Sequence, residues 1–289
     1  MTKHLSSQYV SNCASAFAYA RDYLKSFDMS QDALDARLLT CAVCDMSPED
    51  LIRNGDRAID KLALRLLETY LTRRVAGEPV SRILGYREFY GRQFKIDPAT
   101  LDPRPDSEVL IEAIHNLALP ADASVLDLGT GSGCLLITLL CENLMWRGLG
   151  VDVSAQALRM SRINASCLHI RERAAFRLSS WFSRVTCQYD LIVSNPPYIA
   201  RDQIDGLQTE VRAYDPMRAL DGGVRGTEPY YEILGSAHKH LKKGGWLICE
   251  IGYDQEEEIQ EMFLVSGYQD IICGKDLGGH PRFVLGQLQ

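Results

Sequence analysis

The spacing of apolar residues divides the chain into parts with different secondary structure. Up to about residue 79, apolar side chains recur at intervals of three and four residues, which is the period of amphipathic helices. Gly77 and Pro79 are typical of a helix end. The pattern predicts a small all-α domain over residues 1–79. Its clearest apolar stripe is Ile59, Leu62, Ala63, Leu66, Leu67, Tyr70 and Leu71.

Residues 80–106 have another pattern. Aromatic and branched side chains surround Gly85 and Gly91, which is typical of a β-hairpin. Pro103 and Pro105 then hold the chain extended ahead of the next helix. We interpret this segment as a hairpin linker that also carries functional residues.

From about residue 122 onward, short apolar strands alternate with amphipathic helices, within a domain that we place at residues 107–289. This alternation predicts an α/β domain with a doubly wound, mainly parallel sheet of the Rossmann-like kind. Ligands of such sheets bind at the carboxyl ends of the strands, so we expect the chemistry there. The predicted strands are 124–128, 148–151, 175–178, 191–194 and 246–251, and the predicted helices are 133–144, 154–168, 229–242 and 255–266.

The charge of the chain bears on its partners. With 31 Lys and Arg against 38 Asp and Glu, the net charge is −7, and no third of the chain is basic. Proteins that hold nucleic acid through phosphates usually carry a basic face, so extended contact with DNA or RNA is disfavoured. No apolar run approaches the ~18–20 residues of a membrane helix, and the N-terminus lacks the apolar core of a signal peptide. We therefore expect a cytoplasmic protein.

The nine cysteines are scattered and odd in number, so we interpret them as reduced core residues. Cys41 and Cys44 have zinc-ligand spacing, but no second pair accompanies them. We expect no metal site.

A glycine-rich loop directly follows the first predicted strand of the sheet and precedes a helix. Glycines allow a sharp turn and close approach of a ligand, and the helix start offers free amide N–H groups. A dinucleotide fingerprint would place its third glycine at Cys134, so this pattern argues against a nicotinamide cofactor. A plain glycine turn is the alternative. The candidate residues are Gly129, Thr130, Gly131, Ser132 and Gly133.

Asp152 stands at the end of the second predicted strand, nineteen residues after Gly133. A carboxylate there can accept two hydrogen bonds from a ribose diol. The alternative is a cap for the next helix, a role that Ser154 could fill instead. Because the glycine loop lies upstream, we interpret Asp152 as a ribose-binding residue of a nucleoside-bearing cofactor.

Asn195, Pro196, Pro197 and Tyr198 follow the fourth predicted strand. Two consecutive prolines make a stiff loop without N–H groups, which leaves the Pro196 carbonyl beside the Asn195 side-chain oxygen. Two fixed acceptors suit a planar –NH₂ group, and Tyr198 adds an aromatic wall. An inert turn would explain the prolines but neither of their neighbours.

Segments 127–133 and 195–198 together resemble the S-adenosylmethionine-dependent methyltransferases that modify planar amino groups. The helical N-terminal domain and segments 85–90 and 103–108 resemble, more specifically, the release factor glutamine methyltransferases of the HemK/PrmC family. The resemblance spans nearly the whole chain. It implies methyl transfer, without a metal, to the glutamine of the Gly-Gly-Gln motif in class-1 peptide chain release factors. The helical domain would grip the factor, and residues 199–226 would shape the approach of the peptide.

The resemblance also implies roles for individual residues. Gly129 to Gly133 would line the methionine part of S-adenosylmethionine, and Asp152 would hold its ribose. Asn195 to Tyr198 would hold the substrate glutamine, with Asn195 also near the cofactor. Glu250 and Arg104 would be further pocket residues.

The adenine contact is the least defined of these roles. Trp181 would lie beside the adenine, although it could instead be an ordinary core residue. The chain departs from the family at Ser180, where an aspartate is usual, and this departure puts the contact in doubt.

The loop at 195–198 does not by itself select the substrate, because adenine and glutamine both present a planar –NH₂ group. A ribosomal-protein glutamine methyltransferase, a DNA or RNA adenine methyltransferase and a non-catalytic binding protein are the alternatives. The acidic balance and the small N-terminal domain favour a protein substrate. We expect a monomer that contacts neither a membrane nor nucleic acid directly.

Overall fold

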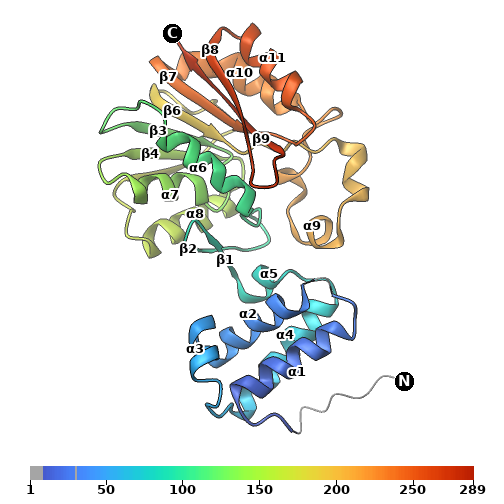
Figure 1. Cartoon of the computed structure of the whole chain (residues 1–289). Helices are drawn as coiled ribbons and strands as arrows, with labels where there is room; N and C mark the ends of the chain where they lie inside the picture. Colours follow the sequence, from blue (N-terminus) through green and yellow to red (C-terminus); the bar gives the residue numbers. More distant parts are fainter. Residues whose placement is uncertain (1–8, 30) are drawn as a thin grey trace. The chain divides into compact units, whose positions relative to one another are not determined.

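A computed structural model describes residues 9–29 and 31–289 (Figure 1). The chain forms two compact units, which divide between Gly85 and Tyr86. No helix within the described residues is both long and apolar enough to cross a membrane.

The first unit is helical, as the spacing predicts. Leu39 of the second helix and Leu67 and Leu71 of the fourth are fully buried in its core. Capping sets the helix starts: the Ser47 hydroxyl accepts a hydrogen bond from the Asp50 N–H in the turn that begins with proline. The helices are α1 (Cys13–Lys25), α2 (Asp32–Cys44), α3 (Pro48–Arg53), α4 (Lys61–Val75) and α5 (Val80–Leu84).

The apolar stripe predicted for α4 is only partly buried. Leu67 is fully buried, whereas Leu62 is 77% and Leu66 41% exposed. On α2, Leu34 and Leu38 are also exposed. Each pair is spaced by four residues and so lies on one face of its helix. The core of this unit therefore leaves apolar surface uncovered on two helices.

The second unit contains a seven-stranded sheet in the order β5-β4-β3-β6-β7-β9-β8. The first five strands pair in parallel, and β9 runs antiparallel to both of its neighbours. This confirms the predicted mainly parallel, doubly wound sheet; the last two strands were not predicted. The strands are β3 (Ser124–Leu128), β4 (Arg147–Asp152), β5 (Ala174–Leu178), β6 (Tyr189–Ser194), β7 (Leu241–Glu250), β8 (Tyr268–Lys275) and β9 (Pro281–Leu288).

Helices cover both faces of this sheet (Figure 1). Successive side chains of a strand point to opposite faces. Val125 and Val193 accordingly pack in the layer of α6, α7 and α8, and Leu126 and Ile192 pack in the layer of α10 and α11. The helices are α6 (Glu108–His115), α7 (Cys134–Glu142), α8 (Ala155–Cys167), α10 (Glu228–His240) and α11 (Glu256–Val265).

The segment interpreted as a hairpin linker, 80–106, is shared between the two units. Its first residues form α5 of the first unit. Its hairpin, β1 (Tyr86–Phe89) and β2 (Arg92–Lys95), is part of the second unit, where Phe89 and Phe94 are fully buried in the core beneath α6 and α7. The hairpin thus belongs to the body that carries the sheet.

Candidate active site

The two candidate loops lie side by side at the carboxyl edge of the sheet. β3 and β6 pair in parallel, with Leu128 opposite Ser194, and the loops leave the sheet from these two residues. The Ser194 hydroxyl also donates a hydrogen bond of 2.9 Å to the Leu128 carbonyl. The parallel register therefore places the glycine loop next to Asn195.

The path of the glycine loop depends on backbone conformations that favour glycine. Gly129, Gly131 and Gly133 have φ of +71°, +55° and +83°. Gly133 has the least room, because a Cβ there would lie 2.7 Å from the Ile137 side chain of α7. The loop is also anchored to α8, since the Ser161 hydroxyl donates a 2.7 Å hydrogen bond to the Gly131 carbonyl. Gly133 therefore serves packing, and the first two glycines form the open turn.

The buried carboxyl group of Asp127 supports this turn through a hydrogen bond. Asp127 accepts a 2.5 Å hydrogen bond from the Thr130 hydroxyl. Burial raises the pKa of Asp127 to about 7; the Thr130 hydrogen bond opposes this shift and the charge of Asp152 adds to it. Sequence reasoning gave Asp127 no role.

Asp152 ends β4 and faces the glycine loop. Its carboxylate oxygens accept hydrogen bonds from the Gly131 N–H at 3.0 Å and the Ser154 N–H at 2.7 Å. Ser154 itself caps α8 by accepting from the Ala157 N–H, so the alternative role considered for Asp152 is filled. Burial raises the pKa of Asp152 in spite of its hydrogen bonds. Each oxygen keeps a lone pair for another donor.

Both loops line one pocket at this edge. Most of the predicted residues are among the described residues that line it; Gly133, Pro196, Tyr198 and Glu250 are not. The predicted residues in its lining are Arg104, Gly129, Thr130, Gly131, Ser132, Asp152, Trp181, Asn195 and Pro197, and Ser107 also lines it.

Trp181 reaches this pocket from a strained turn after β5. Its φ of +43° is uncommon for a bulky side chain. The Ser179 hydroxyl supports the turn by donating to the Trp181 carbonyl at 2.9 Å and accepting from the Arg184 N–H at 3.0 Å. Ser179 lines the pocket, while Ser180 is exposed and is not part of the described lining.

A second cavity adjoins the first, because the two share Asn195 and Arg104. Tyr198 and Glu250 line this second cavity. Arg104 is held at the junction by an ion pair of 2.5 Å with the buried Asp215. The apolar walls of the second cavity are Leu101, Ile199, Leu207, Val211, Ala219 and Leu220.

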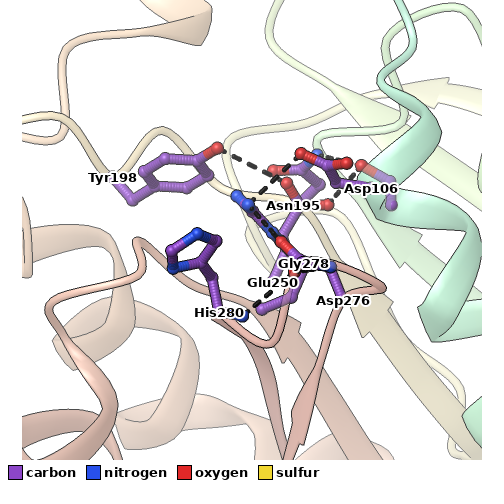
Figure 2. Close-up of polar contacts among 9 residues, drawn as sticks. Asp106, Asn195, Tyr198, Glu250, Asp276, Gly278 and His280 are labelled. Atoms are coloured by element: carbon purple, nitrogen blue, oxygen red, sulfur yellow. Dashed lines mark hydrogen bonds and ion pairs between the residues drawn. The ribbon is translucent and has the colours of Figure 1, made fainter.

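Glu250 ends β7 and is buried within a polar cluster (Figure 2). Its carboxylate accepts hydrogen bonds from the Ser107 hydroxyl at 2.5 Å and the Tyr198 hydroxyl at 3.5 Å. Burial raises the pKa of Glu250 to about 7, against the opposing effects of the Ser107 hydrogen bond and the positive charge of Arg282.

Arg282 of β9 is fixed beside this carboxylate. Its guanidinium forms ion pairs with Asp276 at 2.7 Å and Asp106 at 3.2 Å. Asp276 in turn accepts from the N–H groups of Gly278 and His280, so the β8–β9 turn is rigidly bonded (Figure 2). Sequence reasoning missed Arg282, since it lies on an unpredicted strand.

The described residues contain no group of three or more His, Cys, Asp and Glu side chains that could hold a metal ion. All nine cysteines are free. Cys41 and Cys44 are buried in the helical unit, and burial raises the pKa of Cys44 to about 12.

Comparison with known proteins identifies both parts of the chain. Residues 15–85 match the family model described as PrmC N-terminal domain, and residues 100–212 match the model described as methyltransferase small domain. Among solved structures, the hMettl16 catalytic domain in complex with the MAT2A 3′UTR hairpin 6 superposes with a TM-score of 0.58. That match covers 85% of this chain and 91% of the other at 17% identity, and shows the fold alone.

Three curated relatives match over almost their whole length. The release factor glutamine methyltransferase of Caulobacter vibrioides is 37% identical, with 94% of each chain covered. That of Cereibacter sphaeroides is 39% identical, covering 95% of this chain and 98% of the relative. That of Vibrio cholerae is 38% identical, covering 94% and 95%. The chain therefore belongs to the family of release factor glutamine methyltransferases.

Proposed function

We propose that this protein transfers a methyl group from S-adenosylmethionine to the side-chain amide nitrogen of the glutamine in the Gly-Gly-Gln motif of class-1 peptide chain release factors. The observation that carries the proposal is the junction of two cavities at Asn195, one reached by the glycine loop and Asp152, the other by Tyr198 and Glu250. The names of the relatives indicate the substrate. The product of the cofactor would be S-adenosylhomocysteine.

The first cavity has donors and acceptors that fit S-adenosylmethionine. The glycine loop offers backbone at close range, Asp152 retains acceptor capacity for ribose hydroxyls, and the Trp181 ring offers a face for adenine. When bound, S-adenosylmethionine supplies an electrophilic methyl group on a sulfonium. We call the segment Gly129–Ser132 together with Asp152 the cofactor side of the site.

The residues around the second cavity would activate the amide. An amide nitrogen is a poor nucleophile because its lone pair is conjugated with the carbonyl. The Asn195 Oδ1 and the Pro196 carbonyl would accept its two N–H groups, and no described residue donates to that carbonyl. These acceptors would orient the lone pair toward the methyl group and stabilise the positive charge that develops on nitrogen. The proton can then leave to water.

The amide side of the site consists of Ser107, Asn195, Tyr198 and Glu250. The Tyr198 ring and the apolar walls of the second cavity suit the methylene groups of a glutamine side chain. We propose that the enzyme acts as a monomer. The release factor would be met in the cytoplasm.

The exposed leucines of α2 and α4 support a protein partner for the helical unit. Leu62→Asp would raise KM for the intact release factor several-fold and leave KM for a short Gly-Gly-Gln peptide unchanged. The matched control is Leu144→Asp, which alters an apolar residue of similar exposure (76% against 77%) in the second unit. If Leu62→Asp changed KM equally for both substrates, the helical unit would have no part in binding the release factor.

The proposed activity is tested with methyl-labelled S-adenosylmethionine and three purified acceptors: a class-1 release factor, ribosomes and duplex DNA. We expect label in the release factor, and none in a release factor whose Gly-Gly-Gln glutamine is replaced by glutamate. Labelling of ribosomes alone would favour a ribosomal-protein glutamine, and labelling of DNA alone an adenine.

A further inference from the structure

A chain of hydrogen bonds leads from Asn195 through Ser107 to Glu250, and the two ends of this chain, Asn195 and Glu250, are labelled in Figure 2. Ser107 has a single hydroxyl proton and donates it to Glu250 Oε2 at 2.5 Å. Its oxygen can therefore only accept from Asn195, whose Nδ2 lies 3.5 Å away. The chain consequently has one direction, which turns Nδ2 toward Ser107 and Oδ1 to the other side.

We propose that Ser107 and Glu250 are positioning residues that orient the Asn195 side-chain amide, so that its oxygen rather than its nitrogen meets the substrate amide. This inference rests on the proposed function, because it matters only if Asn195 accepts a hydrogen bond from a substrate –NH₂ group. Neither positioning residue is itself an acceptor for the substrate –NH₂ group in this arrangement. Both act through Asn195.

The direction of the chain depends on the charge of Glu250. A carboxylate only accepts hydrogen bonds, whereas a carboxylic acid or a glutamine amide can also donate. A donor at this position would let Ser107 turn its proton toward Asn195 Oδ1. The Asn195 amide would then present its –NH₂ to the –NH₂ of the substrate, and an acceptor would be lost.

Several groups around Glu250 influence its charge. Arg282 favours the carboxylate and is held in place by its two ion pairs. Burial and the charge of Asp106 favour the acid, with a net pKa of about 7. Activity that depends on ionised Glu250 therefore rises with pH through about 7. The other titratable groups facing it are Tyr198, Tyr230 of α10 and Cys134 of α7.

Ser107→Ala and Glu250→Gln test the inference with a Gly-Gly-Gln peptide as substrate. We expect kcat to fall roughly 10- to 100-fold, by analogy with hydrogen-bond partners that orient metal-binding side chains. KM for the peptide and the Kd for S-adenosylmethionine should change less than kcat, although Ser107 lines the first cavity and Glu250 the second, because both residues exert the proposed effect through Asn195. Ser107→Thr keeps the hydroxyl and should recover most of kcat. The rise of kcat with pH through 7 should disappear in Glu250→Gln.

A matched control separates this effect from loss of folding stability. Ser124 donates a similar hydrogen bond of 2.7 Å to the Asp190 carboxylate at the amino end of β3, far from the loops at the carboxyl edge. Ser124→Ala should lower the melting temperature and leave kcat unchanged.

A double-mutant cycle gives the decisive outcome. If Ser107 acts through Asn195, Ser107→Ala should have no further effect on kcat in the Asn195→Ala background. Losses that multiply, or wild-type kcat in both single variants, would overturn the inference. Failure of the proposed function would look different, since the wild-type enzyme itself would then leave the glutamine unmethylated.

Discussion

On the cofactor side of the site, most polar groups belong to consecutive residues and many of them are backbone atoms; on the amide side, they are side chains drawn from distant segments. The cofactor side consists only of the turn that follows β3 and of Asp152, and Asp152 accepts hydrogen bonds from backbone N–H groups. The amide side joins Ser107 to Glu250 across 143 residues. A site assembled from single side chains should be far more sensitive to single substitutions than one built from backbone.

The largest expected effect falls on the amide side. Asn195→Ala removes a fixed acceptor from the reacting amide, and we expect kcat to fall about 10²- to 10³-fold, as for loss of one preorganised hydrogen bond in an active site. The Kd for S-adenosylmethionine should change little. Steady-state kinetics and calorimetry measure the two quantities, and an unchanged kcat would contradict the role given to Asn195.

On the cofactor side, Asp152→Ala should act on binding instead. The loss of hydrogen bonds to a charged acceptor corresponds to about 1.5–3 kcal/mol of cofactor affinity. Isothermal titration with S-adenosylmethionine would measure this. Wild-type affinity in the variant would exclude Asp152 from the cofactor side.

Each side has a buried carboxyl group whose pKa is raised to about 7, Asp127 next to the cofactor side and Glu250 on the amide side. Between the pKa of the unfolded chain and about 7, the folded protein keeps these two protons, whereas the unfolded chain has lost them. The stabilisation from the protonated carboxyl groups is therefore complete below the unfolded-state pKa and is lost as pH rises through about 7. Glu250→Gln should reduce the fall in the free energy of unfolding between pH 4.5 and 7, and at pH 8 the variant should be more stable than the wild type by up to about 3 kcal/mol. Denaturant unfolding across this range tests it, and an unchanged pH slope would show that Glu250 ionises normally.

The smallest expected effect concerns the backbone of the glycine loop. Gly131→Ala has room for its Cβ, since the nearest atom is 3.9 Å away, but φ of +55° costs a non-glycine residue about 1 kcal/mol. Gly206→Ala is the control, with open space and no positive φ. A thermal scan should show destabilisation in Gly131→Ala only; equal melting temperatures would mean that the loop adapts.

The same contrast explains what could be predicted from the sequence. The glycine loop and the residues from Asn195 to Tyr198 are contiguous motifs placed at strand ends by a regular alternation of strands and helices, so they could be located without coordinates. The contacts of Ser107, Glu250 and Arg282 arise from tertiary packing, which no local pattern encodes. Their roles in binding and catalysis remain predictions that the variants above test.

The unpredicted strands and the turn at Trp181 have local reasons. β8 is an edge strand, and a shift of register between Gln269 and Ile272 interrupts its alternation of buried and exposed residues. The positive φ of Trp181 is set by the hydrogen bonds of Ser179, so neighbouring residue types do not reveal it. The exposure of Leu62 likewise shows that helical spacing marks an apolar face without showing what covers it.

The most direct test of the account is mass spectrometry of release factor peptides after incubation with the enzyme and S-adenosylmethionine. We predict one added methyl group on the side-chain nitrogen of the Gly-Gly-Gln glutamine with wild-type enzyme, and almost none with Asn195→Ala under the same conditions. Methylation of any other residue, or equal methylation of this glutamine by both enzymes, would contradict it.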